Sequence, residues 1–497
     1  MANTIHNCWL MRLRPTWLVA LVVYSLAFAT PGYADNLALP EIGDPSGNLI
    51  SPSQERRFGQ AFMRSVRATQ PVVTDPWMAS YIQSLGNQLV NNSNAGGRSF
   101  HFFLIDEPQL NAFAGPGGYI GVYTGLITTT ETESELASVI AHEIAHVTQN
   151  HLLRTFDAVQ RMSLPVAALA IAALVIGSAL DHPEAGVATA SGLQAGLAQR
   201  QINFTRSNEQ EADSIGIDTL ANSGFDPQSM PVFFERMGQA TRLYDDGRLP
   251  EFLRTHPVTT NRIADARGRA GNYPYRQRPD SLDYHLLRAI LKNRQFNNSK
   301  DSVKYFRETL ASHRYRNEEA QRFGYVLALI DDRQYTKASD LLKSLLLQRP
   351  EQIAYIITQA QLLNKSGKPG EGAQTLKDGL DLYPGNYPLT IYYAESLLDL
   401  GKSREALELL EKQLRARPED EAVLRLLAKA AGDSGQISLG HEYLAEYYYQ
   451  TGSLEAAVQQ LRIALKNSAD DYYMDARITA RLRTMEEELA DLKKRSE

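Results

Sequence analysis

The chain has 497 residues, 51 of them Lys or Arg and 57 Asp or Glu, and carries a formal net charge of −6. This length predicts about two to four domains with room for large cores. A mildly acidic chain without a basic run interleaved with aromatic residues lacks the footprint of a nucleic-acid binder, so we expect no nucleic-acid partner. The single cysteine, Cys8, lies near the N-terminus, which excludes disulfides and cysteine-based zinc sites from the rest of the chain.

Residues 1–34 are typical of a Sec-type signal peptide. Arg12 and Arg14 precede an apolar run over 17–29, and small residues end at Ala34, near which we expect cleavage. We therefore expect a Gram-negative periplasmic protein, with peripheral attachment to the outer membrane left open. A permanent anchor is disfavoured because a membrane-spanning helix needs about 20 apolar residues. Residues 35–52, rich in Pro, Gly, Asn and Ser, predict a flexible lead-in.

The next segment combines helical and strand patterns. Helical spacing of apolar residues predicts helices over 53–70 and 75–90, and the chain over 100–123 then predicts strand, turn and strand. We expect the strand 119–123 to lie at the edge of a sheet beside the following helix. An edge strand in that place is suited to binding an extended peptide by strand addition.

The sequence His142-Glu143-Ile144-Ala145-His146 is an H-E-x-x-H motif. Thr132, with Glu135 three residues later, predicts a capped helix that contains it. Two histidines four residues apart lie on one helix face, so both imidazoles can reach one metal ion. The glutamate between them is then placed to take a proton from a water molecule.

A hydrolytic zinc site needs a third protein ligand. His151 is a poor candidate, because a continuous helix rotates it to the face opposite His142. Glu209 and Asp213 are better candidates, since they are four residues apart on one face of a predicted helix and Glu211 points away from that face. One of the two can bind the metal while the other accepts a hydrogen bond from a ligating histidine, and spacing alone leaves their order open.

The segment 163–180 carries no charge over its length and is interrupted by Pro165 and Gly177. We expect a buried or site-covering segment. Contact with a membrane surface and a short membrane span are the alternatives, and the span would make the protein an integral membrane protease.

Small residues and prolines recur in the C-terminal part of the chain with a period of 34 residues. The positions are Ala338, Gly372 and Ala406, and then Pro350, Pro384 and Pro418. This is the tetratricopeptide pattern, in which small residues let paired helices approach and proline follows the second helix. We expect a linker over 271–283, an all-α repeat domain over 284–480 with degenerate first repeats, and a charged C-terminal helix or tail over 481–497. Gly435 and Gly440 occupy the fourth register, but a further unit begins at Gly452, 51 residues after the third, so we expect one helix there to serve two units.

The motifs together resemble the M48 metallopeptidases, which combine H-E-x-x-H with a distal E-x-x-A-D. Here the two parts are 142–146 and 209–213, and residues 111–114 with Gly118 and the segment 255–257 also match that family. The turn at 115–118 and the degenerate first repeats depart from the family pattern. The resemblance implies an α+β zincin-like domain over 53–270, mostly helical with a small sheet. It also implies the following site: zinc ligands His142, His146 and Glu209, one zinc ion per chain, Glu143 as general base, and Asp213 hydrogen-bonded to a ligating histidine.

His256 lies between Thr255 and Pro257, in a segment that matches the family. A surface histidine is the simplest interpretation. The resemblance favours a role at the metal, either as a catalytic hydrogen-bond donor or as a fourth ligand that blocks the water position.

The resemblance, together with the export signal and the repeats, implies a periplasmic zinc endopeptidase with a chaperone-like repeat domain. Its implied substrates are unfolded or misassembled outer-membrane β-barrel proteins, and the repeats would bind the machinery that assembles these barrels. The alternative is a repeat-based chaperone or adaptor in which proteolysis is dispensable. Segment 163–180 adds the expectation of peripheral membrane contact.

Overall fold

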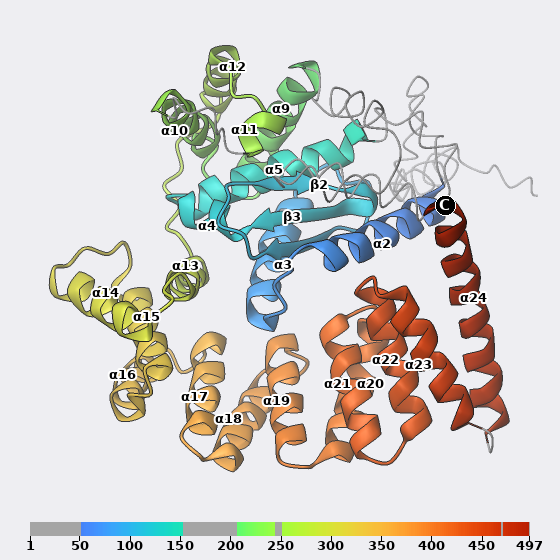
Figure 1. The fold of residues 1–497 in the computed structure, drawn as a ribbon. Helices are drawn as coiled ribbons and strands as arrows, with labels where there is room; N and C mark the ends of the chain where they lie inside the picture. The colour runs from blue at the N-terminus through green and yellow to red at the C-terminus, as the bar shows by residue number, and fades with distance from the viewer. Residues whose placement is uncertain (1–50, 153–205, 244–250, 469–470, 497) are drawn as a thin grey trace, which may run out of the picture. The chain divides into compact units, whose positions relative to one another are not determined.

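The structure is a computed structural model that describes residues 51–152, 206–243, 251–468 and 471–496. The expected signal peptide, most of the lead-in and the uncharged segment 163–180 lie outside the described residues. The expected fold class is confirmed, because a mainly helical unit with a small sheet precedes a series of paired helices (Figure 1). Among the described residues, no helix combines the length and the apolar character that crossing a membrane requires.

Two capped helices begin the described chain. Helix α2 (Pro52–Thr69) starts with a capping box, in which Ser51 and Gln54 each bind the other's backbone N–H. Helix α3 (Pro76–Val90) is capped by Asp75, whose carboxylate accepts the N–H groups of two first-turn residues. Both satisfy backbone donors that a helix leaves unpaired at its N-terminus.

The sheet has three strands, β1 (His101–Ile105), β2 (Ala112–Ala114) and β3 (Tyr119–Tyr123), in the order β1-β3-β2. Strand β3 pairs in parallel with β1 and antiparallel with β2. The expectation that 119–123 is an edge strand is therefore wrong, because both of its sides are paired. Strand β2 is the edge strand that packs against the motif helix.

Alternate side chains of the strands enter two different cores. Phe102 and Leu104 face the core that contains α3 and the motif helix, whereas Phe103 and Ile105 face the core that contains α2. The sheet is thus buried on both faces, and the short helix α4 (Thr124–Thr129) follows β3 directly.

The motif helix α5 (Glu133–Thr148) is buried over nearly its whole length. Its N-cap Thr132 accepts the Glu135 N–H, as expected, but the Glu135 carboxylate binds the N–H of Glu131 rather than that of the cap. Figure 1 shows α9 (Arg206–Asn222), α10 (Ser229–Leu243), α11 (Glu251–Thr255) and α12 (Thr260–Ala270) grouped around α5.

Helix α9 crosses α5 closely at Gly216. A Cβ atom at this position would lie 3.3 Å from the His142 backbone nitrogen and 2.9 Å from Met230 Cε. Gly216 follows Glu209 and Asp213 at helical spacing, so the face that carries both carboxylates is pressed against the motif.

The remaining helices form the repeat region. They are α13 (Leu282–Arg294), α14 (Ser299–Ala311), α15 (Glu318–Asp331), α16 (Tyr335–Gln348), α17 (Ile353–Lys365), α18 (Pro369–Leu382), α19 (Tyr387–Asp399), α20 (Ser403–Ala416), α21 (Glu421–Asp433), α22 (Ile437–Gln450), α23 (Leu454–Lys466) and α24 (Tyr472–Ser496). Helix α22 packs against both α21 and α23, as expected for a helix shared by two units. The domain boundaries given above stay predictions.

The repeat region contacts the preceding M48-like region at several places, including the following two. The Tyr284 hydroxyl lies 3.0 Å from Thr130 Oγ1, and Arg288 donates to the Ile127 carbonyl at 2.7 Å, which ties α13 to the segment before α5. At the other place, Arg64 of α2 binds Glu488 of α24 at 3.1 Å.

Candidate metal centre

Four buried side chains from three parts of the fold converge on one point. His142 and His146 come from α5, Glu209 from the first turn of α9, and His256 directly follows α11. One nitrogen or oxygen atom from each lies within 4.8 Å of the others. All four residues are at most 3% exposed.

The distances between these atoms are short. The Nε2 atoms of His142 and His146 are 2.9 Å apart, and His142 Nε2 lies 3.3 Å from His256 Nδ1. The Glu209 oxygens lie 3.0 Å from His256 Nδ1, 3.4 Å from His146 Nε2 and 3.6 Å from His142 Nε2.

These spacings fit the ligands of a tetrahedral metal ion. Nitrogen and oxygen ligands at zinc-bond lengths of about 2.0–2.1 Å stand about 3.3 Å from one another in a tetrahedron. The distances of 2.9–3.6 Å measured here lie around that value. The donor set, imidazole nitrogens with one carboxylate, is one that zinc accepts.

The close approach of the two motif histidines also calls for a cation. Asp213 Oδ1 lies 2.9 Å from His142 Nδ1, which favours a proton on that nitrogen and leaves the Nε2 lone pair directed at the cluster. Burial holds the pKa of His146 well below its usual value, so this ring is neutral. Where the lone pairs of both Nε2 atoms face each other, they repel unless a cation lies between them.

Arg262 of α12 holds the carboxylates in place. It donates to both Asp213 oxygens at 2.8 Å, and its Nη1 lies 2.7 Å from Glu209 Oε2. The guanidinium carbon also lies over the Phe234 ring, 5.0 Å from the ring centroid. Sequence reasoning did not identify Arg262, because a lone arginine in a helix carries no motif.

Neighbouring cationic and hydrogen-bonding groups determine the ionisation of Glu209 and Asp213. Burial alone would raise the pKa of Glu209, but the imidazoles of His256 and His146 outweigh it and hold the pKa well below its usual value. Burial also opposes ionisation of Asp213, and the hydrogen bonds from His142 and Arg262 lower its pKa nonetheless. Both residues are therefore carboxylates at neutral pH.

Glu143 occupies a different environment. It is 1% exposed, and burial raises its pKa although His256 and His142 oppose the rise. The backbone of Ala114, in the edge strand β2, hydrogen-bonds its carboxylate. Oε1 of Glu143 lies 3.7 Å from His256 Nε2, which places a proton acceptor beside the cluster.

His256 does not lie on the surface. Its backbone N–H donates to the Phe252 carbonyl at 2.8 Å, and its ring lies 5.1 Å from the Phe252 ring. Burial alone would lower the pKa of His256, but Glu209 and Glu143 outweigh burial and raise it.

The expectation that His151 faces away from the motif is wrong. Helix α5 ends at Thr148, so the rotation of a continuous helix does not apply to residue 151. His151 is 0% exposed, and its ring lies 4.9 Å from that of His146.

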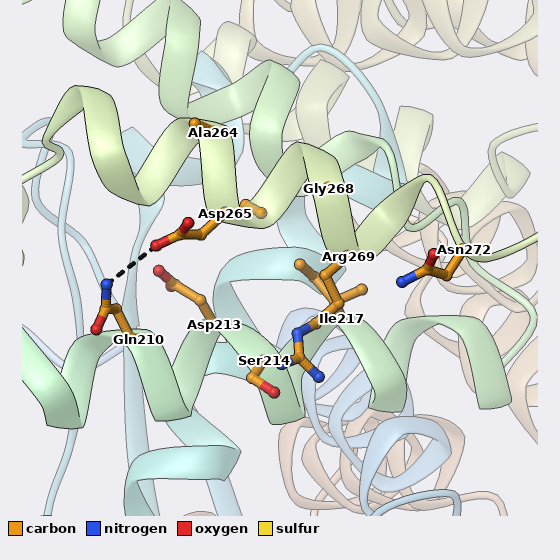
Figure 2. Close-up of a pocket in the computed structure, with 10 residues that line it drawn as sticks. Gln210, Asp213, Ser214, Ile217, Ala264, Asp265, Gly268, Arg269 and Asn272 are labelled. Atoms are coloured by element: carbon orange, nitrogen blue, oxygen red, sulfur yellow. Dashed lines mark hydrogen bonds between the residues drawn. The ribbon is translucent and has the colours of Figure 1, made fainter.

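A pocket of about 590 Å³ lies between α9 and α12 (Figure 2). Asp213, Asp265, Arg269 and Asn272 are among its polar residues, and Gln210 donates to Asp265 across it at 3.0 Å. None of the four converging residues lines this pocket, but Asp213, which contacts His142, does.

Comparisons with known proteins agree with this geometry. The model of peptidase family M48 matches residues 76–270, and a tetratricopeptide-repeat model matches residues 363–430. The putative beta-barrel assembly-enhancing protease of Vibrio cholerae is 37% identical over 84% of this chain and 86% of its own length. The beta-barrel assembly-enhancing protease of Escherichia coli is 33% identical over 94% of this chain and 95% of its own, and that of Yersinia pestis is 33% identical over 88% and 90%.

The family match, the repeats and the buried cluster of candidate ligands therefore support the same assignment. The chain belongs to peptidase family M48 and is a metallopeptidase with C-terminal tetratricopeptide repeats.

Proposed function

We propose that the protein is a zinc endopeptidase of the Gram-negative cell envelope that cleaves unfolded or misassembled outer-membrane β-barrel proteins. The observation that carries the catalytic part is the buried cluster of three imidazoles and one carboxylate with Glu143 beside it. His142, His146 and Glu209 would hold the ion. Zinc, when bound, would polarise the scissile carbonyl and lower the pKa of a water molecule.

In this proposal Glu143 is the general base. Its raised pKa suits it to take a proton from the attacking water and to pass that proton to the leaving amine. The hydrogen bond from Ala114 orients the carboxylate. Because the donor belongs to the edge strand, a peptide bound along β2 would lie next to the base.

His256 would act as a fourth ligand in the resting enzyme. Its Nδ1 lies 3.3 Å from His142 Nε2 and 3.0 Å from Glu209 Oε1, so it would fill the fourth position of a tetrahedral ion, which water or substrate needs. The segment that carries His256 would have to move before hydrolysis. If the block limits turnover, His256→Ala raises hydrolysis of a generic unfolded protein. A fall in hydrolysis would instead assign His256 to stabilisation of the transition state.

The substrate part of the proposal rests on the relatives, which are named for barrel assembly, and on the repeats. Repeat arrays bind partners along an extended surface, so the repeats would bind the barrel-assembly machinery or the substrate. The purified protein should cleave a β-barrel substrate that has been unfolded in urea and diluted into buffer faster than the same substrate folded in detergent. Equal rates for the two forms would contradict selection of unfolded barrels.

Metal content tests the ligand set. Elemental analysis of the purified protein should give one zinc per chain for wild type and a large loss for His142→Ala and Glu209→Ala. Asp265→Asn removes an exposed carboxylate from the neighbouring α12 and serves as the control. Stoichiometric zinc in His142→Ala would overturn the assignment.

Glu143→Gln separates the protease from a chaperone in which proteolysis is dispensable. It should lower the rate of peptide hydrolysis at least about 100-fold while zinc content is unchanged. Full rescue of a strain lacking the protein by Glu143→Gln would favour the chaperone.

A further inference from the structure

The chain reverses direction directly after the motif helix. Helix α5 ends at Thr148, and Asn150 adopts a left-handed backbone conformation with φ 55°. Asparagine is the residue other than glycine that most readily adopts this conformation at a helix end. The Gln149 and Asn150 N–H groups bind the carbonyls of Ala145 and Val147, both at 3.0 Å. This turn brings the next residue back onto the helix that it has just left.

His151 is consequently fixed against His146. The two Nδ1 atoms are 2.9 Å apart, with ring planes at 73°. The following residue, Leu152, is 9% exposed and belongs to the core between α2 and the sheet, which anchors the segment. On its other side, His151 Nε2 lies 3.1 Å from Glu211 Oε2.

These contacts connect a candidate ligand to a carboxylate through a second imidazole. His146 directs Nε2 at the converging cluster, so Nδ1 is its other nitrogen. A neutral imidazole has one donor nitrogen and one acceptor nitrogen. If His146 binds the metal through Nε2, its Nδ1–H donates to His151 Nδ1, and His151 Nε2–H donates to Glu211. Every donor in this series then has an acceptor.

We propose that His151 is a positioning residue that fixes the tautomer and ring orientation of His146, and that Glu211 in turn fixes the tautomer of His151. The inference rests on the proposed role of His146 as a metal ligand. Ligating histidines nearly always donate their second N–H, and loss of the acceptor typically weakens metal binding about 10–100-fold.

The two motif histidines are thereby oriented by different means. His142 meets the buried carboxylate of Asp213 directly, and Arg262 neutralises that carboxylate. His146 meets the imidazole of His151, whose carboxylate partner Glu211 is 42% exposed. Solvent weakens the hydrogen bond between His151 and Glu211. Removal of Glu211 should therefore reduce zinc affinity less than removal of His151.

The test is the zinc affinity of the purified full-length protein, measured by competition with a chromogenic chelator. His151→Phe keeps a ring but lacks an acceptor, and it should weaken zinc binding about 10–100-fold. His151→Asn should restore most of the affinity, because its Oδ1 is separated from Cα by the same number of bonds as the histidine Nδ1. Glu211→Ala should weaken binding by a few-fold, and Glu211→Gln, which keeps an acceptor oxygen, by less.

A spectroscopic measurement adds a signature that a packing role would not produce. The visible absorption of the cobalt-substituted protein reports ligand geometry, and it should change in His151→Phe and return toward wild type in His151→Asn. Gln210→Ala is the matched control, since it truncates an exposed neighbour of Glu211 on α9 whose amide donates to Asp265, and it should leave both zinc affinity and the cobalt spectrum unchanged.

The outcomes separate this inference from the ligand assignment on which it rests. If His146→Ala keeps stoichiometric zinc, the ligand set itself fails. If His146→Ala loses zinc but His151→Phe binds it with wild-type affinity and spectrum, the positioning role of His151 is overturned. Should His151→Phe fail to fold, unchanged zinc affinity in Glu211→Ala would overturn the series, because that position is partly exposed and tolerates truncation.

Discussion

Arg262 binds Asp213 through two parallel hydrogen bonds of 2.8 Å, and both residues are 4% exposed. The guanidinium is thus the buried counterion of the carboxylate that orients His142. Its third contact, to Glu209, extends this function to a proposed ligand.

Arg262→Met should strongly destabilise the metal-free protein, since it leaves two buried carboxylates without their cation. We expect a loss of about 3–5 kcal/mol in the free energy of unfolding, measured with denaturant. Arg269→Met, an exposed position on the same helix, should change the free energy by no more than about 0.5 kcal/mol. Equal effects of the two changes would show that Arg262 does not stabilise the fold.

Gly216→Val should separate α9 from α5 and weaken metal binding. The new side chain would meet the His142 backbone and Met230, so Glu209 and Asp213 would move away from the motif. Gly238→Val in α10 is the control, because the nearest atom to its Cβ is Ile263 Cδ1 at 3.9 Å. Zinc affinity should fall at least about 10-fold in the first variant and stay near wild type in the second. The reverse order would contradict the proposed crossing.

Gly452→Ala should disturb the contact between the repeats and α2. Gly452 has φ 82°, and a Cβ there would lie 2.6 Å from the Arg64 carbonyl oxygen. Gly435, with φ 87°, has no described atom within 4 Å of the same position. Both substitutions carry the backbone penalty of about 1–2 kcal/mol, but only Gly452→Ala should also raise hydrogen exchange in α2. Equal exchange in α2 for both variants would mean that the contact is not formed in solution.

His285 should make the protein less stable in acid. Burial lowers its pKa below 6.5, Arg288 adds to this effect, and Asp280 opposes it. The unfolded chain therefore binds the proton more readily, so the free energy of unfolding decreases as pH falls from about 6.5 towards the folded-state pKa. Above about pH 6.5 the contribution of His285 to the free energy of unfolding is fully present.

His285→Gln should remove this contribution. The wild type should lose stability relative to the variant between pH 7.5 and 5 by no more than about 1.4 kcal/mol per pH unit. Denaturant unfolding at several pH values measures the difference, in which the titration of other groups cancels. Parallel curves for the two proteins would exclude His285 as the source.

Local patterns were sufficient to predict much of the site. The cap at Thr132 and the four-residue spacings of His142 with His146 and of Glu209 with Asp213 follow from helix geometry, which is short-range. The structure brings these residues together because Gly216 lets the two helices meet. A small residue seven positions after Glu209 was a usable signal for that crossing.

Other features depend on where helices end and on long-range packing. His151 was misplaced because the helical rotation was extended beyond Thr148, and Asn150 was the available sign of the reversal. Strand 119–123 was assigned to an edge because the sequence pattern does not reveal that β1 pairs with its second side. Arg262 lies 49 positions after Asp213, and no local pattern connects the two.

The contact between Arg64 and Glu488 joins residues 424 positions apart, whereas the proposed ligands and Arg262 all lie between residues 142 and 262. A chain that is made from its N-terminus presents the second group long before the first pair can meet. The metal centre can therefore assemble while the repeats are still being synthesised. The contact of α24 with α2 thus requires nearly the whole chain, whereas the residues of the proposed metal centre are contributed by less than a third of it.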